Sequence, residues 1–190
     1  CDQISDKILD TALSQDKTSK MAVECTIKDN LIFIYGEATT KAKISYDKIA
    51  KQVLKEIGYE EEYEVITKIS KQSKEISNAV NRKKITAGDQ GIMFGYATNE
   101  TKELMPLPIL LANKITQKLS EARKKDKNSI LLPDGKSQIT VEYEDDIPKR
   151  IDTIIVSSSH KKDVSLNTLK KYIKEEIIKK VIPKNYLDSN

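Results

Sequence analysis

The sequence predicts an α+β fold of repeated hairpin-plus-helix units, with helices layered on mostly antiparallel sheets. Short segments alternate apolar and polar residues, longer ones place apolar residues at helical spacing, and the order helix, hairpin, helix occurs twice. At an offset of 120, residues 44–57 (ISYDKIAKQVLKEI) align without gaps with residues 164–177 (VSLNTLKKYIKEEI). Helical periodicity alone would reproduce the apolar positions, so the shared polar residues, such as Ser45 and Ser165, indicate an internal repeat.

The first half of the chain has the pattern of a helix, a hairpin, a second helix and a strand. Residues 2–16 form an amphipathic helix with five apolar residues on one face: Ile4, Ile8, Leu9, Ala12 and Leu13. Residues 21–27 and 31–35 flank a turn-forming triplet, which predicts a hairpin. Ser45 is placed to cap a helix that Gly58 ends. A half-buried strand follows, with alternation at Tyr63, Val65, Thr67 and Ile69.

The second half repeats this order after a long helix. That helix is predicted over residues 107–125, and Pro133-Asp134-Gly135 predicts a turn. A second hairpin is expected from residues 138–143 and 150–156. Ser165 caps a last helix that runs to about Val181 and is ended by a proline.

A glycine-rich stretch, residues 86–101 (TAGDQGIMFGYATNET), joins the two halves. It holds three of the chain's six glycines, Gly88, Gly91 and Gly95, with apolar residues between them. Glycine clusters favour tight turns and close backbone approach, so the stretch is expected to be a buried, irregular crossover. Residues 71–86, which precede it, have few apolar side chains and predict a mobile loop that is either a linker or functional.

Composition excludes several classes of function. The chain has 190 residues, 38% hydrophobic and 33% charged, and a formal net charge of +4. No dense basic stripe interleaved with aromatics is present, so nucleic acid is not an expected partner. No apolar run approaches the ~20 residues that span a bilayer, so no membrane partner is expected either. The two cysteines lack metal-ligand spacing, and a cytoplasmic location is expected.

The polar candidates for chemistry lie at predicted strand ends and in loops. Asp134 and Lys136 flank Gly135, and this tripeptide is either an ordinary turn or a phosphate or ribose contact. Glu24 and Glu37 are either solvent-facing strand residues or ligands. P-loop, GxGxxG, GxSxG and HExxH patterns are absent, and the single histidine, His160, is more typical of a surface residue than of a catalyst.

Seven segments in order resemble one enzyme family, S-adenosylmethionine synthetase (methionine adenosyltransferase). They are CDQISDKILD at the start, GEATT from Gly36, KEIGY from Lys55, AGDQGIMFGYATNET from Ala87, ELMPLPI from Glu103, PDGKSQITVEY from Pro133 and RIDTIIVS from Arg150. The resemblance implies a transferase that joins ATP and L-methionine, releases tripolyphosphate and hydrolyses it to diphosphate and phosphate. It also implies Mg²⁺ and K⁺ as cofactors, and a homodimer or homotetramer with active sites shared between chains.

The resemblance also assigns roles to single residues. Glu24 resembles the potassium ligand. Glu37, Gln72 and Asp89 resemble methionine contacts, and Asp89 lies in the family's GAGDQG motif. Asp134, Gly135 and Lys136 resemble the family's ATP contacts. The resemblance makes Lys136 the catalytic cation beside the phosphates. The implied domains are a truncated N-terminal domain (residues 1–75), a flexible gating loop (76–86) and a middle domain (87–190).

The departures from the family pattern concern completeness. The family's His-Pro-Asp-Lys loop, with a magnesium-binding aspartate, is expected before Cys1, and a third domain with further ligands is expected after Asn190; the magnesium ligands are therefore expected outside this chain. Thr86, Lys74 and Ser159 replace a glycine, a proline and a glutamine of the family. The 190-residue chain alone is expected to be inactive as a synthetase. The alternative is a non-catalytic, subunit-like module that keeps the interface and partial ligand binding.

Overall fold

A computed structural model describes residues 1–73, 75, 87, 90–126 and 128–187. The chain divides into two compact units, Cys1–Ile92 and Met93–Asn190. The predicted gating loop, residues 76–86, lies outside the described residues, so the predicted domain boundaries stay a prediction. The elements of both units confirm an α+β fold of helices on mixed and antiparallel sheets.

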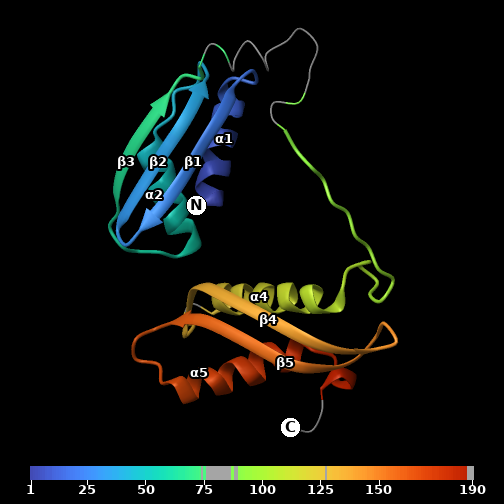
Figure 1. Cartoon of the computed structure of the whole chain (residues 1–190). Coiled ribbons are helices and arrows are strands. Elements are labelled where there is room, and N and C mark those ends of the chain that lie inside the picture. The colour runs from blue at the N-terminus through green and yellow to red at the C-terminus, as the bar shows by residue number, and fades with distance from the viewer. Residues whose placement is uncertain (74, 76–86, 88–89, 127, 188–190) are drawn as a thin grey trace. The chain divides into compact units, whose positions relative to one another are not determined.

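The first unit is a three-stranded sheet with two helices against it (Figure 1). Its elements are α1 (Asp2–Gln15), β1 (Lys20–Lys28), β2 (Leu31–Thr39), α2 (Tyr46–Ile57) and β3 (Glu64–Ser70). The predicted hairpin is confirmed, because β1 and β2 pair antiparallel. β3 pairs parallel with β2, and α2 makes the crossover that such a pairing needs.

Helix boundaries in the first unit follow the local signals. Ser45 occupies the N-cap of α2 without a side-chain hydrogen bond, and Gly58 ends the helix with a left-handed φ of 112°. In α1, Ile4, Ile8 and Ala12 are buried as predicted. Leu9 and Leu13 were expected on the same face. Each is 38% exposed, because both lie at the edge of the helix face that packs on the core.

The second unit is a two-stranded antiparallel sheet with helical segments packed together against it (Figure 1). Its elements are α4 (Leu107–Lys125), β4 (Leu131–Glu144), β5 (Ile147–His160), α5 (Leu166–Tyr172), the π-helical segment η1 (Ile173–Ile178), α6 (Lys179–Val181) and the 3₁₀ segment η2 (Lys184–Tyr186). The predicted last helix is thus continuous but contains a π-helical stretch, and the Ser165 side chain accepts a hydrogen bond from the Thr168 amide at 3.2 Å, as a cap.

Two sequence predictions are wrong in this region. Pro133, Asp134 and Gly135 do not form a turn but lie inside β4, where the pairing register shifts between Leu131 and Gly135. A bulge accommodates a proline that lacks the ladder N–H. The apolar residues in the described part of the glycine-rich stretch are not buried: Phe94, for example, is 93% exposed.

Each unit has its own apolar core. The core of the first is formed by Ile4, Ile8, Val23, Cys25, Ile32, Ile34, Ile49, Ala50, Val53 and Leu54. That of the second is formed by Leu107, Leu111, Ala112, Ile115, Leu119, Leu131, Ile139, Ile151, Leu169, Ile173, Ile177 and Ile182. Both cores lie between helices and one sheet face, and the opposite face of each sheet carries polar side chains together with exposed apolar ones, such as Ile66 and Ile155. Among the described residues, no helix has the length and apolar character needed to cross a membrane.

Candidate functional site

The face of the first sheet that points away from its helices carries Glu24 and Glu37. Side chains alternate along a strand, and the inward positions of β1 and β2 are buried in the core. Glu24 pairs with Tyr35, and Glu37 pairs with Ala22. The two glutamates are therefore diagonal neighbours on one face, and residues in this relationship are separated by roughly 7–8 Å across the two strands.

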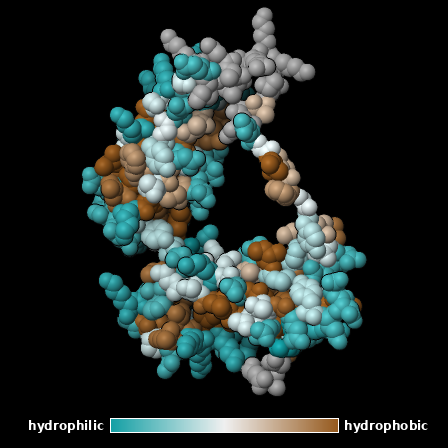
Figure 2. Space-filling model, in the orientation of Figure 1, coloured by the Kyte–Doolittle hydropathy of each residue, from teal (hydrophilic) through white to brown (hydrophobic). Residues whose placement is uncertain are grey.

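An aromatic pair lies beside these carboxylates. The rings of Phe33 and Tyr35 on β2 stack with centroids 5.1 Å apart. Tyr35 is directly opposite Glu24 and is 39% exposed. Figure 2 shows the hydrophilic and apolar residues mixed over this unit. Acidic groups beside an aromatic surface suit a ligand that has a cationic end and an apolar stem.

Gly36 determines how closely β1 approaches this part of the site. Its φ is +133°, and a Cβ placed on it would lie 2.0 Å from the Ala22 carbonyl oxygen. Only glycine fits this backbone conformation and this approach. Gly36 precedes Glu37, so this close approach sets the backbone from which the Glu37 side chain projects.

Gln72 lies near the same end of the sheet. β3 ends at Ser70, which pairs with Glu37, and Gln72 follows two residues later and is half-buried. The structure thus brings together Glu24, Glu37 and the backbone that bears Gln72. The third predicted methionine contact, Asp89, lies outside the described residues.

The predicted phosphate contacts belong to β4 of the second unit. Gly135 faces α4, because a Cβ on it would lie 3.1 Å from Leu119 Cδ1. Lys136, the next residue, therefore points away from the helices, and it is exposed. Asp134 is also exposed. Among the described residues, Lys136 forms no ion pair, so its charge is free for an anionic ligand.

The candidate residues thus form two groups on separate units. The first group is acidic and amide-bearing, which suits the ammonium group of an amino acid. The second offers a cation, which suits a phosphate. His160, the last residue of β5, has Nδ1 2.9 Å from the Lys161 carbonyl oxygen, and it makes no hydrogen bond to the described members of either group.

Sequence reasoning missed one polar contact in the second unit. The Tyr143 hydroxyl donates to Glu100 Oε2 at 2.8 Å and ties the C-terminal end of the glycine-rich stretch to β4. Partial burial, together with this hydrogen bond, raises the pKa of Tyr143 to about 12. The two residues are 43 positions apart, and no local pattern connects them.

Two family models match this chain along its length. Residues 1–84 match the N-terminal domain of S-adenosylmethionine synthetase, and residues 84–190 match its central domain. The chain belongs to the S-adenosylmethionine synthetase family. The resemblance seen in seven sequence segments is thereby confirmed.

Two curated relatives support the membership in this synthetase family. The S-adenosylmethionine synthase of Clostridium botulinum (strain Alaska E43 / Type E3) is 42% identical over 209 aligned residues, covering 100% of this chain and 54% of that protein. The S-adenosylmethionine synthase of Syntrophobacter fumaroxidans (strain DSM 10017 / MPOB) is 45% identical over 200 residues, covering 98% of this chain and 51% of that protein. The chain spans about half the length of the relatives it matches.

Proposed function

We propose that this chain contributes to S-adenosylmethionine synthesis from ATP and L-methionine. The observation that carries the proposal is the match of two consecutive synthetase domains over the whole chain. The placement of Glu24 and Glu37 on one exposed sheet face and the free charge of Lys136 support it.

In the proposed reaction, a lone pair on the methionine sulfur attacks C5′ of the ATP ribose. The C5′–O bond breaks, tripolyphosphate leaves with the bonding pair, and water then cleaves it to diphosphate and phosphate. Lys136 neutralises charge on the leaving polyphosphate, and Asp134 and Gly135 complete the ATP contact of β4. Glu37, Gln72 and Asp89 hold the methionine, so that the sulfur is oriented for attack.

The proposed cofactors differ in how well the described residues fit them. No three His, Cys, Asp or Glu side chains of the described residues come together as a metal site. These residues do not fit a magnesium site, and no step is assigned to Mg²⁺. For K⁺, the Glu24 carboxylate supplies one oxygen ligand on an open face, and a bound K⁺ would add positive charge beside the substrate site.

A shared-site homodimer or homotetramer is part of the proposal. Apolar side chains stand exposed on the described glycine-rich segment: Ile92, Met93, Phe94 and Tyr96. Exposed apolar clusters of this kind favour contact with another chain. The proposed location is the cytoplasm, which is supported by two free cysteines, Cys1 and Cys25.

A chimera tests the proposed function. The region of the C. botulinum synthase that aligns with this chain is replaced by residues 1–190, and S-adenosylmethionine formation is measured with ATP, methionine, Mg²⁺ and K⁺. We expect turnover by the chimera and little or none by the 190-residue chain alone. A folded chimera that binds substrates without turnover would instead favour the non-catalytic module, and synthesis by the isolated chain at the chimera's rate would overturn the expected inactivity.

A further inference from the structure

A polar network at the C-terminal end of α1 holds the chain that follows β2. Through Oδ1, the Asp16 carboxylate accepts hydrogen bonds from the Thr18 hydroxyl at 2.7 Å and the Thr18 amide at 3.0 Å. Through Oδ2, it accepts the Lys41 amide at 2.9 Å. One oxygen therefore closes the connection between α1 and β1. The other bonds the backbone 25 positions later, just beyond the end of β2.

Gln15 makes a second bridge to the same segment. Its Nε2 donates to the Lys43 carbonyl oxygen at 3.3 Å, and its Oε1 accepts the Lys43 amide at 3.1 Å. A side-chain amide that pairs with both backbone groups of one residue imitates the pairing of a neighbouring strand. The Ser19 and Thr40 hydroxyls lie 2.6 Å apart, and Thr40 Oγ1 accepts the Ala42 amide at 3.0 Å. Each residue of the segment 40–43 thus takes part in at least one of these bonds.

The network lies at the end of the hairpin that bears Glu37. The pairing of β1 with β2 ends at Lys20 and Thr39, and Glu37 lies two residues before Thr39. Strand ends open more easily than strand centres. Gly36 precedes Glu37 and has the backbone freedom of glycine, so the constraint on Glu37 comes from the ladder and from the anchored segment 40–43.

The Gln15 bridge is poorly suited to a purely stabilising role. Gln15 and Lys43 are exposed, and water competes for exposed hydrogen-bonding groups, so neutral bonds between them add little net free energy. The core of this unit already draws buried apolar side chains from both helices and from the sheet. What the bridge provides is a fixed backbone position at the end of β2.

We propose that Asp16 and Gln15 are positioning residues for the methionine site, which hold the end of β2 so that the Glu37 carboxylate stays in place for the substrate ammonium group. This inference rests on the proposed function, because that function gives Glu37 its contact with methionine. Loosening the segment weakens methionine binding, since a small displacement of a substrate contact reduces its interaction strongly. ATP binding changes little, because the proposed ATP contacts belong to β4 of the second unit.

Steady-state kinetics of the chimera test the proposal. Asp16→Ala is expected to raise the KM for methionine at least about fivefold, with kcat and the KM for ATP within about twofold. Gln15→Ala is expected to raise the methionine KM about threefold. Asp16→Asn keeps one oxygen acceptor and should fall between Asp16→Ala and the parent. If Asp16→Ala fails to fold, Gln15→Ala decides the outcome, because it removes only an exposed side chain.

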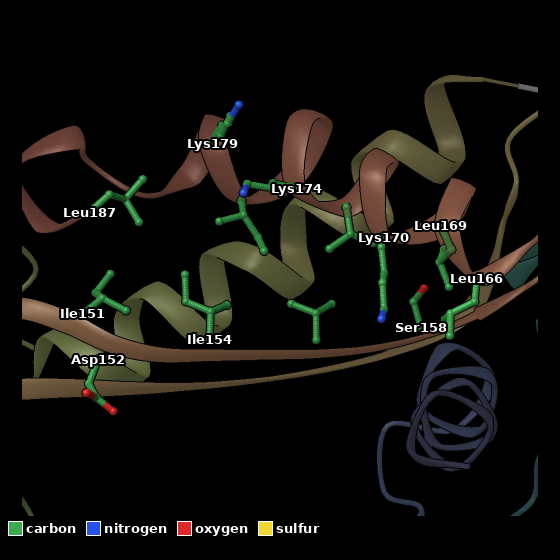
Figure 3. A pocket seen from close by; sticks show the side chains of 13 residues that line it. Ile151, Asp152, Ile154, Ser158, Leu166, Leu169, Lys170, Lys174, Lys179 and Leu187 are labelled. Atoms are coloured by element: carbon green, nitrogen blue, oxygen red, sulfur yellow. The ribbon is translucent and has the colours of Figure 1, made fainter. Parts of the chain in front are cut away.

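Two controls separate positioning from a general loss of stability. Ile8→Val trims a fully buried core side chain of α1. Ile154→Val trims a side chain that points into the groove of about 660 Å³ between β5 and the segment formed by α5 and η1 (Figure 3). Both should lower the urea midpoint and leave the methionine KM within about twofold. An equal rise in KM for Ile8→Val and Asp16→Ala would overturn the proposal, because lost stability alone would then explain it.

A double-mutant cycle shows whether Asp16 acts through Glu37. In the Glu37→Gln background, Asp16→Ala should raise the methionine KM by less than about twofold, because the charge that it positions is already gone. If Asp16→Ala raises the KM by the same factor in both backgrounds, the two residues act independently and the proposal is wrong.

Amide exchange in the 190-residue chain tests the positioning without catalysis. Asp16→Ala should speed exchange at residues 36–39 at least about tenfold and leave residues 31–34, near the hairpin turn, unchanged. Unchanged exchange at residues 36–39 would overturn the proposal whatever the kinetics. If exchange responds as expected but the parent chimera makes no S-adenosylmethionine, the proposed function fails. The role in methionine binding then falls with it, while the anchoring of the strand end stands.

Discussion

Glu24 and Glu37 lie on adjacent antiparallel strands, two register positions apart and on the same outward face of the first sheet. Glu24 pairs with Tyr35, and Glu37 pairs with Ala22. Among the described residues, neither carboxylate forms an ion pair. Like charges so close on one sheet face oppose folding slightly. A cationic ligand, such as the methionine ammonium or K⁺, offsets this repulsion.

Replacing Glu37 with glutamine tests the methionine contact. In the chimera, Glu37→Gln is expected to raise the KM for methionine at least about tenfold, because a charged hydrogen bond to the ammonium group is lost. The KM for ATP should change little. Glu64→Gln is the matched control, since Glu64 is an exposed residue at the far end of the same sheet. Equal effects of the two substitutions on methionine KM would contradict the assigned role.

Alanine at Gly36 is expected to disrupt the hairpin. The added Cβ would lie 2.0 Å from the Ala22 carbonyl oxygen at a φ of +133°. We expect a loss of at least about 3 kcal/mol in the free energy of unfolding, measured by urea denaturation and far-UV circular dichroism. Gly95→Ala is the control, because its Cβ would have no atom within 4 Å, and it should change the free energy by less than about 0.5 kcal/mol. A comparable loss for both variants would show that the close approach is not the cause.

Acid stability should depend on Asp16 at the end of α1. Its carboxylate accepts the Lys41 amide at 2.9 Å and the Thr18 hydroxyl and amide at 2.7 and 3.0 Å. These bonds, the Lys41 amide first, lower the pKa of Asp16 from 3.8 to about 2. The depressed pKa means that its stabilising contribution is present above pH 3.8 and is lost as the pH falls through about 2.

The measurement for Asp16 is the urea midpoint as a function of pH. Asp16→Asn should lower the urea midpoint at neutral pH. It should also reduce the further fall of the midpoint between pH 3.8 and about 2. Asp10→Asn, at an exposed position of α1, should leave the pH profile of the parent chain unchanged. An Asp16→Asn profile parallel to that of the parent would exclude the carboxylate as the titrating group.

Alkaline titration should single out Tyr143 among the eight tyrosines. Partial burial and the hydrogen bond to Glu100 raise the pKa of Tyr143 from 10.0 to about 12. The contribution of the neutral phenol to stability is therefore complete below pH 10 and is lost as the pH rises through about 12. Tyrosinate absorbance should show a late step that Tyr143→Phe removes and Glu100→Gln moves to lower pH. A late step that survives Tyr143→Phe would assign it to another tyrosine.

Local signals in the sequence predicted most helices and hairpins. The helix Leu107–Lys125 and the stop at Gly58 follow from apolar spacing and from glycine's freedom at positive φ. The parallel pairing of β3 was not predicted, because alternation indicates a face but not a partner strand. Pro133 signalled a turn, yet the register shift in β4 accommodates it.

The candidate site was predicted less completely than the fold. Family resemblance assigned Glu24, Glu37 and Lys136, and the structure places all three on outward-facing strand positions. Contacts between distant residues, such as Tyr143 with Glu100, depend on how segments pack and leave no periodic signal. The exposure of the described glycine-rich segment is likewise a packing result, since its composition alone favoured burial.

The rate of S-adenosylmethionine formation by the chimera carrying Lys136→Met tests the central claim most directly. If Lys136 neutralises the leaving polyphosphate, kcat should fall by about 100-fold or more, with the KM for methionine little changed. Lys162→Met, which removes an exposed lysine in the turn after β5, should leave kcat within about twofold. A kcat for Lys136→Met close to that of Lys162→Met would contradict the account.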